Sequence, residues 1–337
     1  MENKPNLYMW GMASFYGGAD TKFAHLIDLL HQEFNITVIP NHDAQLSDAY
    51  WSDYYKKHGV NFCSKNDLPR SLNGVSLALC NDKFFDDNLC KLAKEKGTKV
   101  IWSAEMMWHR EGEKKAIEDG YVDKVLYVSE IQKSRLSYPD NVPWAITGNY
   151  INPDQFPFKE RDNVRFTIGR LSRADPDKYP EDFPVFYELL SIPNVKFRVM
   201  AWSDELRAKY KWHDFDDRWD LLGESQENQL EFLYSLDLFV YPLGHKFTES
   251  WGRSTVEAML TGAIPFVQTG HHLENLIESG QSGYVLDDFE EVKFHINYLY
   301  KNERFRRDMS AECSRHAREE LCNREEHIKI WKEALDV

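Results

Sequence analysis

Closely spaced cysteines are missing from this chain. The sequence contains no Cys-x-x-Cys pair, and its five cysteines lie at positions 63, 80, 90, 313 and 322. An odd and scattered set of this kind excludes a disulfide framework and argues against a structural zinc site, because both need closely matched thiols. We therefore expect reduced cysteines that serve packing.

Long hydrophobic runs are also missing. No stretch approaches the roughly 20 apolar residues of a membrane-spanning helix. The first residues, MENKPNLYMWGM, have neither the charged start nor the apolar centre of a signal peptide. These features predict a soluble protein located in the cytoplasm.

An excess of basic residues is the third absence. The formal net charge is −14 at pH 7, which argues against a protein whose whole surface binds nucleic acid or an anionic membrane. The acidic excess is uneven, since residues 1–150 are close to neutral and most of the negative charge lies after them. A large anionic acceptor is therefore compatible with the first half alone.

The chain does have the length and the apolar content for two domains. It has 337 residues, of which 42% are hydrophobic and 14% are aromatic. Apolar strand-like runs alternate with amphipathic stretches, which is typical of α/β folds with parallel sheets. Strands are expected at 7–12, 35–40, 76–80, 100–103 and 125–129, and again at 164–169, 195–201, 236–241, 264–268 and 284–286. Helices are expected at 20–32, 181–191, 226–235, 254–261, 272–279, 289–301 and 304–334.

Two series of strands indicate two Rossmann-like units. The boundary is expected within 150–159, where Asn152-Pro153 and Phe156-Pro157 interrupt helical structure. The predicted domains are 1–155 and 156–315, followed by a C-terminal helical segment at 316–337.

The most informative stretch is 247–268, FTESWGRSTVEAMLTGAIPFVQ. Glu249 and Glu257 flank a glycine-containing turn that leads into an apolar helix. The turn 250–254 presents backbone N–H groups at a helix N-terminus, where phosphate groups bind readily. A ligand with a central phosphate and hydroxyl groups at both ends suits this pattern, and a nucleotide sugar is such a ligand.

A second charged loop, GRLSRADPDK at 169–178, follows the first expected strand of the second unit. Its cations would stabilise negative charge on a departing diphosphate. Asp175 and Asp177 also form a DxD pattern that can hold Mg²⁺. Because Arg173 and Lys178 already supply positive charge beside them, we favour a metal-independent site in which both aspartates serve the turn.

These motifs together resemble retaining glycosyltransferases of family 4. The resemblance rests on Glu249, seven residues, Glu257, then Ala-Met-x-x-Gly-x-x-Pro, and on the Gly-Arg-Leu-Ser...Lys loop. The segment NYINPDQFPF also resembles the interdomain linker of that family. The resemblance implies a GT-B fold, with two Rossmann-like domains facing each other across a cleft. It further implies an acceptor-binding N-terminal domain, a donor-binding C-terminal domain and a last helix that crosses back.

The resemblance also implies a reaction and its residues. A hexosyl or pentosyl unit would pass from a nucleoside diphosphate sugar to a hydroxyl acceptor by front-face attack, with retained configuration and without a required cofactor or metal. Glu249 would contact the donor sugar and Glu257 the ribose, while Arg170 and Lys178 would stabilise the leaving group. The residues expected to bind the donor are Gly17, Gly18, Arg173, Ser250, Trp251, Gly252, Arg253, Ser254 and Glu257.

Three positions are less directly matched. Gly17 and Gly18 belong to a turn, Tyr-Gly-Gly-Ala-Asp, that resembles the Gly-Gly-Ala-Glu of the family. His109 is the expected catalytic histidine of the first unit, with Glu105 as the alternative. His271-His272 stand where the family has small residues, so we expect an effect on which sugar is accepted.

The sequence is also compatible with other functions. The acceptor could be hydroxymethylated DNA, as in phage glycosyltransferases. The chain could instead be an epimerase or phosphorylase on the same fold, or a non-catalytic nucleotide-sugar binding module. The aromatic cluster 50–55 could stack sugars or bases, although such residues more often pack internally.

Overall fold

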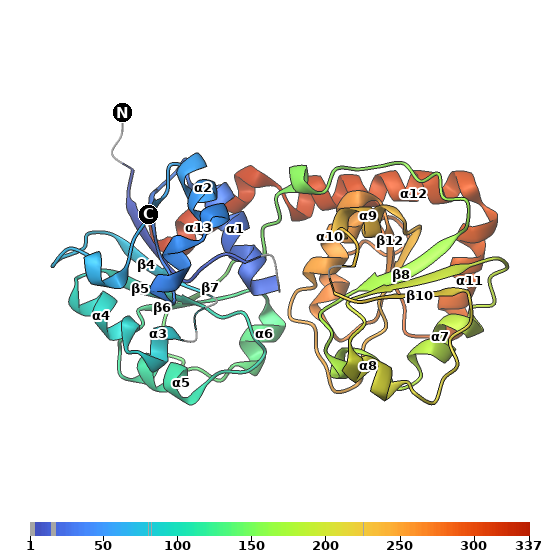
Figure 1. Ribbon diagram of the computed structural model, residues 1–337, viewed down its shortest axis with the longest axis horizontal. Helices are drawn as coiled ribbons and strands as arrows, with labels where there is room; N and C mark the ends of the chain where they lie inside the picture. Colours follow the sequence, from blue (N-terminus) through green and yellow to red (C-terminus); the bar gives the residue numbers. More distant parts are fainter. Residues whose placement is uncertain (1–3, 15–17, 80, 82, 225) are drawn as a thin grey trace. The chain divides into compact units, whose positions relative to one another are not determined.

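The computed structural model describes residues 4–14, 18–79, 81, 83–224 and 226–337. The chain divides into two compact units (Figure 1). Unit 1 consists of Met1–Asn152 together with Arg324–Val337, and unit 2 consists of Pro153–Asn323. The chain therefore passes between the units at 152/153 and at 323/324, whereas the limits predicted from the sequence are 155 and 315.

Unit 1 contains a seven-stranded sheet in the order β3-β2-β1-β4-β5-β6-β7. Its strands are β1 Asn6–Trp10, β2 Asn35–Ile39, β3 Asn61–Phe62, β4 Val75–Ala78, β5 Lys99–Ser103, β6 Lys124–Tyr127 and β7 Trp144–Ile146. Every pair of neighbouring strands is parallel. The direction of the strand order reverses between β1 and β4, and in open α/β sheets ligands bind at the carboxyl ends of the strands beside such a reversal.

Helices cover both faces of this sheet. They are α1 Gly18–Leu30, α2 Ala49–Lys57, α3 Lys83–Asp86, α4 Leu89–Glu95, α5 Glu111–Glu118, α6 Glu130–Arg135 and α13 Arg324–Leu335. One buried cluster joins Phe23 of α1, Trp51 of α2 and Trp331 of α13. A second buried cluster includes Phe84 of α3 and Ile117 of α5, and it packs these two helices against the sheet. The result is a helix–sheet–helix sandwich, and the amphipathic helix predicted at 20–32 is confirmed with slightly different ends.

Unit 2 repeats this architecture with a six-stranded parallel sheet, β10-β9-β8-β11-β12-β13. Its strands are β8 Thr167–Leu171, β9 Lys196–Met200, β10 Trp219–Leu222, β11 Leu238–Val240, β12 Ile264–Val267 and β13 Tyr284–Val285. Its α-helices are α7 Phe183–Leu189, α8 Asp204–Lys209, α9 Gln229–Tyr234, α10 Arg253–Thr261, α11 Phe289–Lys301 and α12 Glu303–His316. Here the strand order reverses between β8 and β11. The two Rossmann-like units expected from the sequence are therefore present.

Two helix predictions are wrong in detail. The segment 272–279 forms only a 3₁₀ turn, His272–Asn275. Gly280 at φ +84° and the Ser282 hydroxyl, which accepts the Glu278 N–H, fold the following residues into a turn. The long helix predicted at 304–334 is also interrupted, because α12 passes into a π-helical turn, Ala317–Leu321, before α13 begins.

Arginines fix the chain on both sides of this interruption. Arg318 donates to the carbonyls of Pro153 (3.1 Å) and Phe156 (2.5 Å) within unit 2. Arg324 donates to the carbonyls of Asp28 and Leu29 near the end of α1 within unit 1. Cations stabilise the carbonyl end of a helix, so Arg324 fastens the start of α13 to α1.

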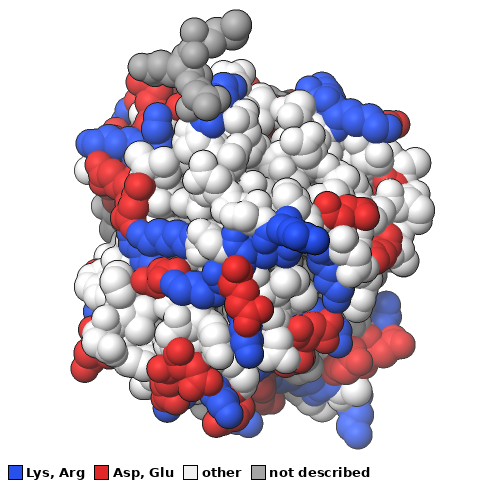
Figure 2. All heavy atoms as spheres, turned by 90° about the vertical axis from the view of Figure 1, so that its left-hand side faces the viewer, with Lys and Arg blue, Asp and Glu red and all other residues white. Residues whose placement is uncertain are grey.

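The other end of α13 is held by lysines. Lys124 at the start of β6 binds the Asp336 carboxylate (2.8 Å), and Lys99 at the start of β5 pairs with the same group. Figure 2 shows a row of Lys and Arg side chains across the visible face, with acidic side chains directly beneath it. Within the described ranges, no helix is long and apolar enough to cross a membrane.

Candidate functional site

The turn before α10 requires glycine. Gly252 caps the helix with φ +97°, a conformation that side chains other than glycine rarely adopt. A Cβ atom at this position would lie 2.1 Å from Cδ2 of Leu273. The N-terminus of α10 therefore begins close to the Leu273 side chain at the carboxyl edge of the sheet, and N–H groups at a helix N-terminus favour an anion.

Glu249 precedes this turn and pairs with Lys178. Lys178 Nζ lies 3.0 Å from Glu249 Oε2, and each of these side chains is only 12% exposed. The Tyr241 hydroxyl donates to the same oxygen at 3.2 Å. Burial acts to lower the pKa of Lys178, but Tyr241 and Glu249 outweigh it and the pKa is raised. Lys178 is therefore a fixed cation at the reversal between β8 and β11.

The backbone of Glu249 is held as well. Its N–H donates to Nδ1 of His271 (3.2 Å), and its carbonyl accepts the N–H of His272 (3.2 Å). Burial lowers the pKa of His272 to about 4. The two histidines that depart from the family pattern thus support the backbone of Glu249 from the loop after β12.

Glu257 belongs to a separate buried pair. Gln229 Nε2 donates to Glu257 Oε2 at 2.7 Å, and Arg253 Nη2 lies 3.6 Å from Oε1. Burial raises the pKa of the Glu257 carboxyl, while Arg253 and Gln229 act in the opposite direction. The two glutamates of the motif therefore contact different partners, and α10 connects them.

Arg170 is completely buried, with its guanidinium between two aromatic rings. The group lies 3.8 Å from the ring centre of Tyr179 and 4.4 Å from that of Tyr241. It donates to the carbonyls of Pro242 (2.7 Å) and Lys178 (3.3 Å). This geometry favours a role in positioning Lys178 over direct contact with a diphosphate, so the catalytic role expected for Arg170 stays a prediction that its burial does not support.

The loop after β8 approaches the loop after β11 very closely. A Cβ atom on Gly244 would lie 2.3 Å from the carbonyl oxygen of Asp177 and 3.0 Å from that of Tyr179. Only glycine permits this approach, which carries Lys178 to Glu249. Phe247 contributes its ring 4.6 Å from Lys178 Nζ.

The DxD pattern is part of the turn. Asp175 caps the 3₁₀ turn Pro176–Lys178 by accepting the Asp177 N–H (3.0 Å), and its other oxygen binds Arg173 (3.1 Å). The turn role predicted for Asp175 is confirmed. Arg173 itself is 56% exposed and can reach a ligand only by leaving this weak surface pair.

The remaining donor residues lie around α10. Trp251 and Arg253 are buried, and Ser250 and Ser254 are partly exposed. In unit 1, Gly18 opens α1 and Gly17 lies outside the described residues.

His109 and Glu105 follow β5 in unit 1. His109 lies in a loop, its ring 5.7 Å from that of Tyr138, and its buried Nδ1 has no hydrogen-bond partner among the residues that the structure describes. Glu105 accepts bonds from the Lys22 ammonium (2.9 Å) and the Ser103 hydroxyl (2.8 Å). Glu105 therefore forms an ion pair with Lys22, whereas the Nδ1 atom of His109 forms no hydrogen bond with the described residues.

Sequence reasoning missed Tyr241 and Gln229, which hold the two glutamates. Tyr241 ends the strand expected at 236–241 and Gln229 lies within the helix expected at 226–235, and neither position carries a motif. Their partners lie 8 and 28 positions away in sequence, so only the fold brings them together.

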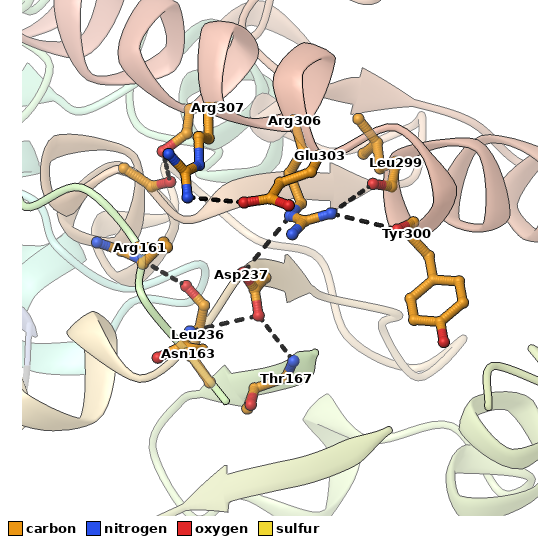
Figure 3. A network of polar contacts seen from close by, with 12 residues as sticks. Arg161, Asn163, Thr167, Leu236, Asp237, Leu299, Tyr300, Glu303, Arg306 and Arg307 are labelled. Carbon is orange, nitrogen blue, oxygen red and sulfur yellow. Dashed lines mark hydrogen bonds and ion pairs between the residues drawn. The ribbon is translucent and has the colours of Figure 1, made fainter. Parts of the chain in front are cut away.

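A polar cavity of about 330 Å³ opens elsewhere in unit 2, at the amino edge of the sheet. Figure 3 shows the network around it, in which Asp237 accepts the Thr167 N–H and pairs with Arg306. The cavity is lined by Arg161, Asp162, Asn163, Asp237, Glu303, Arg306 and Arg307. It faces away from the motif residues along the strands, since Asp237 precedes β11 and Tyr241 follows it.

The two Rossmann-like units with parallel sheets define a two-unit α/β protein of the GT-B class. Residues 151–319 match the family model described as glycosyl transferases group 1. Because this match covers half of the chain, the chain belongs to the glycosyl transferases group 1 family. The matched range is almost all of unit 2.

Solved structures share the complete fold. HepE from Anabaena, in complex with UDP-glucose, has a TM-score of 0.73 at 13% identity, covering 99% of this chain and 100% of that chain. Sucrose-phosphate synthase from Thermosynechococcus elongatus has a TM-score of 0.67 at 12% identity, covering 98% of both chains. A glycosyltransferase from Rickettsia africae has a TM-score of 0.70 at 11% identity, covering 99% of both. No match was found among curated proteins.

Proposed function

We propose that this protein is a retaining glycosyltransferase that moves a sugar from a nucleoside diphosphate sugar to a hydroxyl acceptor. The observation that carries the proposal is the buried Lys178–Glu249 pair beside the glycine turn of α10. It combines a fixed cation, a carboxylate and a helix N-terminus at the strand reversal. Family membership and the UDP-glucose held by HepE support a UDP-sugar as the first donor to test.

In the proposed reaction, the bond from the anomeric carbon to the diphosphate oxygen breaks. The acceptor oxygen forms its bond on the same face, and its proton passes to the departing phosphate oxygen. Lys178 stabilises the charge that develops on the diphosphate, and it does so without reorganising because Glu249 and Tyr241 already hold it. Glu249 orients the sugar hydroxyls, and Glu257 binds the ribose.

Other donor residues would act around this centre. The turn 250–254 would contact the phosphates, with Arg253 and Arg173 as further cations. Arg170 would hold the Lys178 turn in place through the Lys178 carbonyl. No metal or other cofactor is required in this scheme, because Lys178 and Arg173 would supply the positive charge that Mg²⁺ could otherwise provide.

The donor site is tested by thermal shift with UDP-, GDP-, ADP- and dTDP-sugars in the presence of EDTA. We expect stabilisation by one nucleotide series, lost in Lys178→Ala and kept in Lys246→Ala, whose side chain is exposed in the neighbouring loop. Stabilisation that appears only after Mg²⁺ is added would bring the DxD into the mechanism. The absence of stabilisation by every donor would refute the proposal.

Retention is tested by NMR on the slow hydrolysis of the stabilising donor. An α-linked donor should release the α-anomer of the sugar first, before mutarotation. Release of the β-anomer first would show inversion. The same mixture detects an epimerised donor, which is the outcome expected for an epimerase.

A DNA acceptor has no structural observation in its favour. On the face seen in Figure 2 the basic side chains form a narrow row bordered by acidic ones, rather than a broad basic surface. Binding of hydroxymethylated duplex that weakens steeply with salt would support this alternative.

A further inference from the structure

The polar cavity at the amino edge of the unit 2 sheet takes no part in the proposed reaction. Its volume of about 330 Å³ lies in the range of about 300–1,000 Å³ that is typical of small-molecule sites. The segments that precede β8 and β11 form its wall together with the start of α12, and every lining side chain is polar or charged. The charges of this wall therefore decide which class of ligand fits.

The least exposed charges of the wall are those of Arg161, Arg306 and Asp237. The side chains of Arg306 and Asp237 are 18% and 4% exposed, and Arg161 is partly buried. Arg161 donates only to backbone carbonyls and to the Thr261 hydroxyl, so in the described part of the chain no carboxylate binds it directly. Burial lowers the pKa of Arg161 to about 10, against the opposing effect of Asp237. Two largely buried cations thus lie beside one buried carboxylate.

Arg306 is the cation with donors left for a ligand. Its Nη1 atom donates to the carbonyls of Leu299 (2.7 Å) and Tyr300 (3.4 Å) at the end of α11, and its Nε atom lies 3.6 Å from Oδ1 of Asp237. Figure 3 shows the guanidinium held between these groups. Among the described residues, none accepts a hydrogen bond from Nη2. This nitrogen therefore keeps two N–H groups for a ligand, on a guanidinium whose position is fixed.

The exposed charges of the region affect the ligand less. Arg307 pairs with Glu160 (3.2 Å) and Glu303 (2.6 Å), and these three side chains are 49%, 66% and 63% exposed. Asp162 is exposed as well. Solvent and salt screen charges at such positions much more than buried charges. The excess positive charge of the buried groups therefore dominates inside the cavity, and it favours an anion.

We infer that this cavity binds a phosphate group through Nη2 of Arg306, with Arg307 as the second cation. A phosphate group carries a charge of about −1.5 to −2 at pH 7, which matches two guanidinium groups, whereas a carboxylate matches one. Inorganic phosphate and small phosphate monoesters both present this group. The inference does not depend on the proposed transferase function, because no residue of the proposed donor site lines the cavity.

Calorimetric titration of the wild-type protein tests this inference. The titrants are inorganic phosphate, glycerol 3-phosphate and acetate at equal ionic strength, so that screening is the same for all three. We expect saturable binding of at least one phosphate compound, and acetate should bind at least about tenfold more weakly. Tighter binding of glycerol 3-phosphate would identify a monoester as the ligand, and tighter binding of inorganic phosphate would identify the free ion. Binding of neither phosphate compound, or acetate binding of equal strength, overturns the inference.

Two arginine variants of α12 locate the binding. Arg306→Lys keeps the positive charge but removes the planar guanidinium, so phosphate binding should weaken by at least about tenfold. Arg304→Gln is the matched control, because Arg304 lies on the same helix, is 98% exposed and does not line the cavity. This control should change the dissociation constant by less than about twofold. Equal weakening in both variants would show non-specific attraction and contradict the inference.

A third variant tests the cavity without disturbing a buried contact. Asp162 lines the cavity, is exposed and forms no side-chain hydrogen bond or ion pair with the described residues. Asp162→Asn removes a negative charge from the wall, so phosphate binding should become about two- to fivefold tighter. Thermal unfolding confirms that the variant is folded. Unchanged or weaker binding in the folded variant would contradict a phosphate site in this cavity.

The donor site requires a separate control, because the proposed reaction also assigns it contacts with phosphate. Lys178→Ala should keep the phosphate binding that Arg306→Lys loses, and Arg306→Lys should keep the stabilisation by UDP-glucose that Lys178→Ala loses. Phosphate binding lost in Lys178→Ala and kept in Arg306→Lys would refute the cavity site and leave the proposed function intact. Phosphate binding that depends on Arg306, without any stabilisation of the wild type by UDP-glucose, would refute the proposed function alone.

Discussion

Both edges of the unit 2 sheet hold charged groups in networks of polar contacts, but the two edges use them differently. At the amino edge, the Arg161 guanidinium donates to the carbonyls of Lys159, Leu233, Leu236 and Thr261 (Figure 3 shows part of this network). At the carboxyl edge, Lys178 and Glu249 satisfy one another through their side chains. The amino-edge cation is thus bound by backbone carbonyls, whereas the carboxyl-edge cation is bound by a carboxylate side chain. The polar cavity at the amino edge therefore belongs to a network that holds the backbone, whereas the carboxyl edge holds the side-chain pair on which the proposed donor site rests.

The largest expected difference concerns catalysis. Lys178→Met should lower the rate of UDP-glucose turnover by about 10²- to 10³-fold, because a preorganised charge at the leaving group is lost. Arg161→Met at the amino edge should leave the rate per folded molecule within about twofold. Steady-state kinetics on folded protein checks both. An equal loss of rate in the two variants would contradict the proposed functional difference between the two edges.

The free energy of unfolding should depend strongly on the amino edge, where little effect on the rate is expected. Asp237 is 4% exposed, pairs with Arg306 and accepts the Thr167 N–H. Asp237→Ala should therefore lower the free energy of unfolding by about 3–5 kcal/mol, as expected when one partner of a buried pair is removed. Urea unfolding measures the change, and a loss below about 1 kcal/mol would show that this network is not essential.

A residue at the carboxyl edge, His272, should make the folded state less stable in acid. Burial lowers the pKa of His272 from its ordinary value to about 4, so the unfolded chain binds a proton more readily than the folded one. The stabilisation by neutral His272 is complete above about pH 6.5 and disappears as the pH falls towards 4, amounting to at most about 3 kcal/mol. Unfolding of the wild type should therefore depend more steeply on pH in this window than that of His272→Gln. Parallel curves would contradict the prediction.

Disturbing the contact between the loops after β8 and β11 should have a smaller effect on stability. Gly244→Ala forces a Cβ atom against the Asp177 carbonyl and should cost about 1–3 kcal/mol. Weaker donor binding should accompany this loss, since the Lys178 turn is pushed from Glu249. Gly112→Ala in α5 is the control, because its nearest neighbour would be 3.7 Å away. Thermal unfolding with and without UDP-glucose measures both effects.

The smallest effect is expected for Arg307 at the amino edge. This residue pairs with Glu160 (3.2 Å) and Glu303 (2.6 Å), but its side chain is 49% exposed. Arg307→Ala should change the free energy of unfolding by about 0–1 kcal/mol, because solvent screens exposed pairs. A larger loss would mean that the amino-edge network extends to the surface.

The sequence predicted most of unit 2 because its signals are local. The strands β8, β9, β11, β12 and β13 and the helix α10 are confirmed, and the glycine turn at Gly252 adopts the positive φ that such a turn needs. The strands β3, β7 and β10 were missed, because they are short edge strands whose residues are mostly not buried, so no apolar run marks them. Arg170 shows a different limit, because the rings that enclose it come from two loops that meet only in the folded chain.

Unit 1 was predictable as a fold but not as a site. Its strands alternate with amphipathic helices as expected, yet the pairing of Lys22 with Glu105 joins residues 83 positions apart.

The return of α13 to unit 1 has a consequence for how the protein is made. Trp331, Ala334 and Leu335 are part of the unit 1 core, together with residues from the first strand and helix. During synthesis on the ribosome, unit 2 emerges complete before this core can be closed. Unit 2 is thus the part of the chain able to fold first, and a nascent unit 1 must wait for the last residues, exposing an apolar groove beside α1 in the meantime.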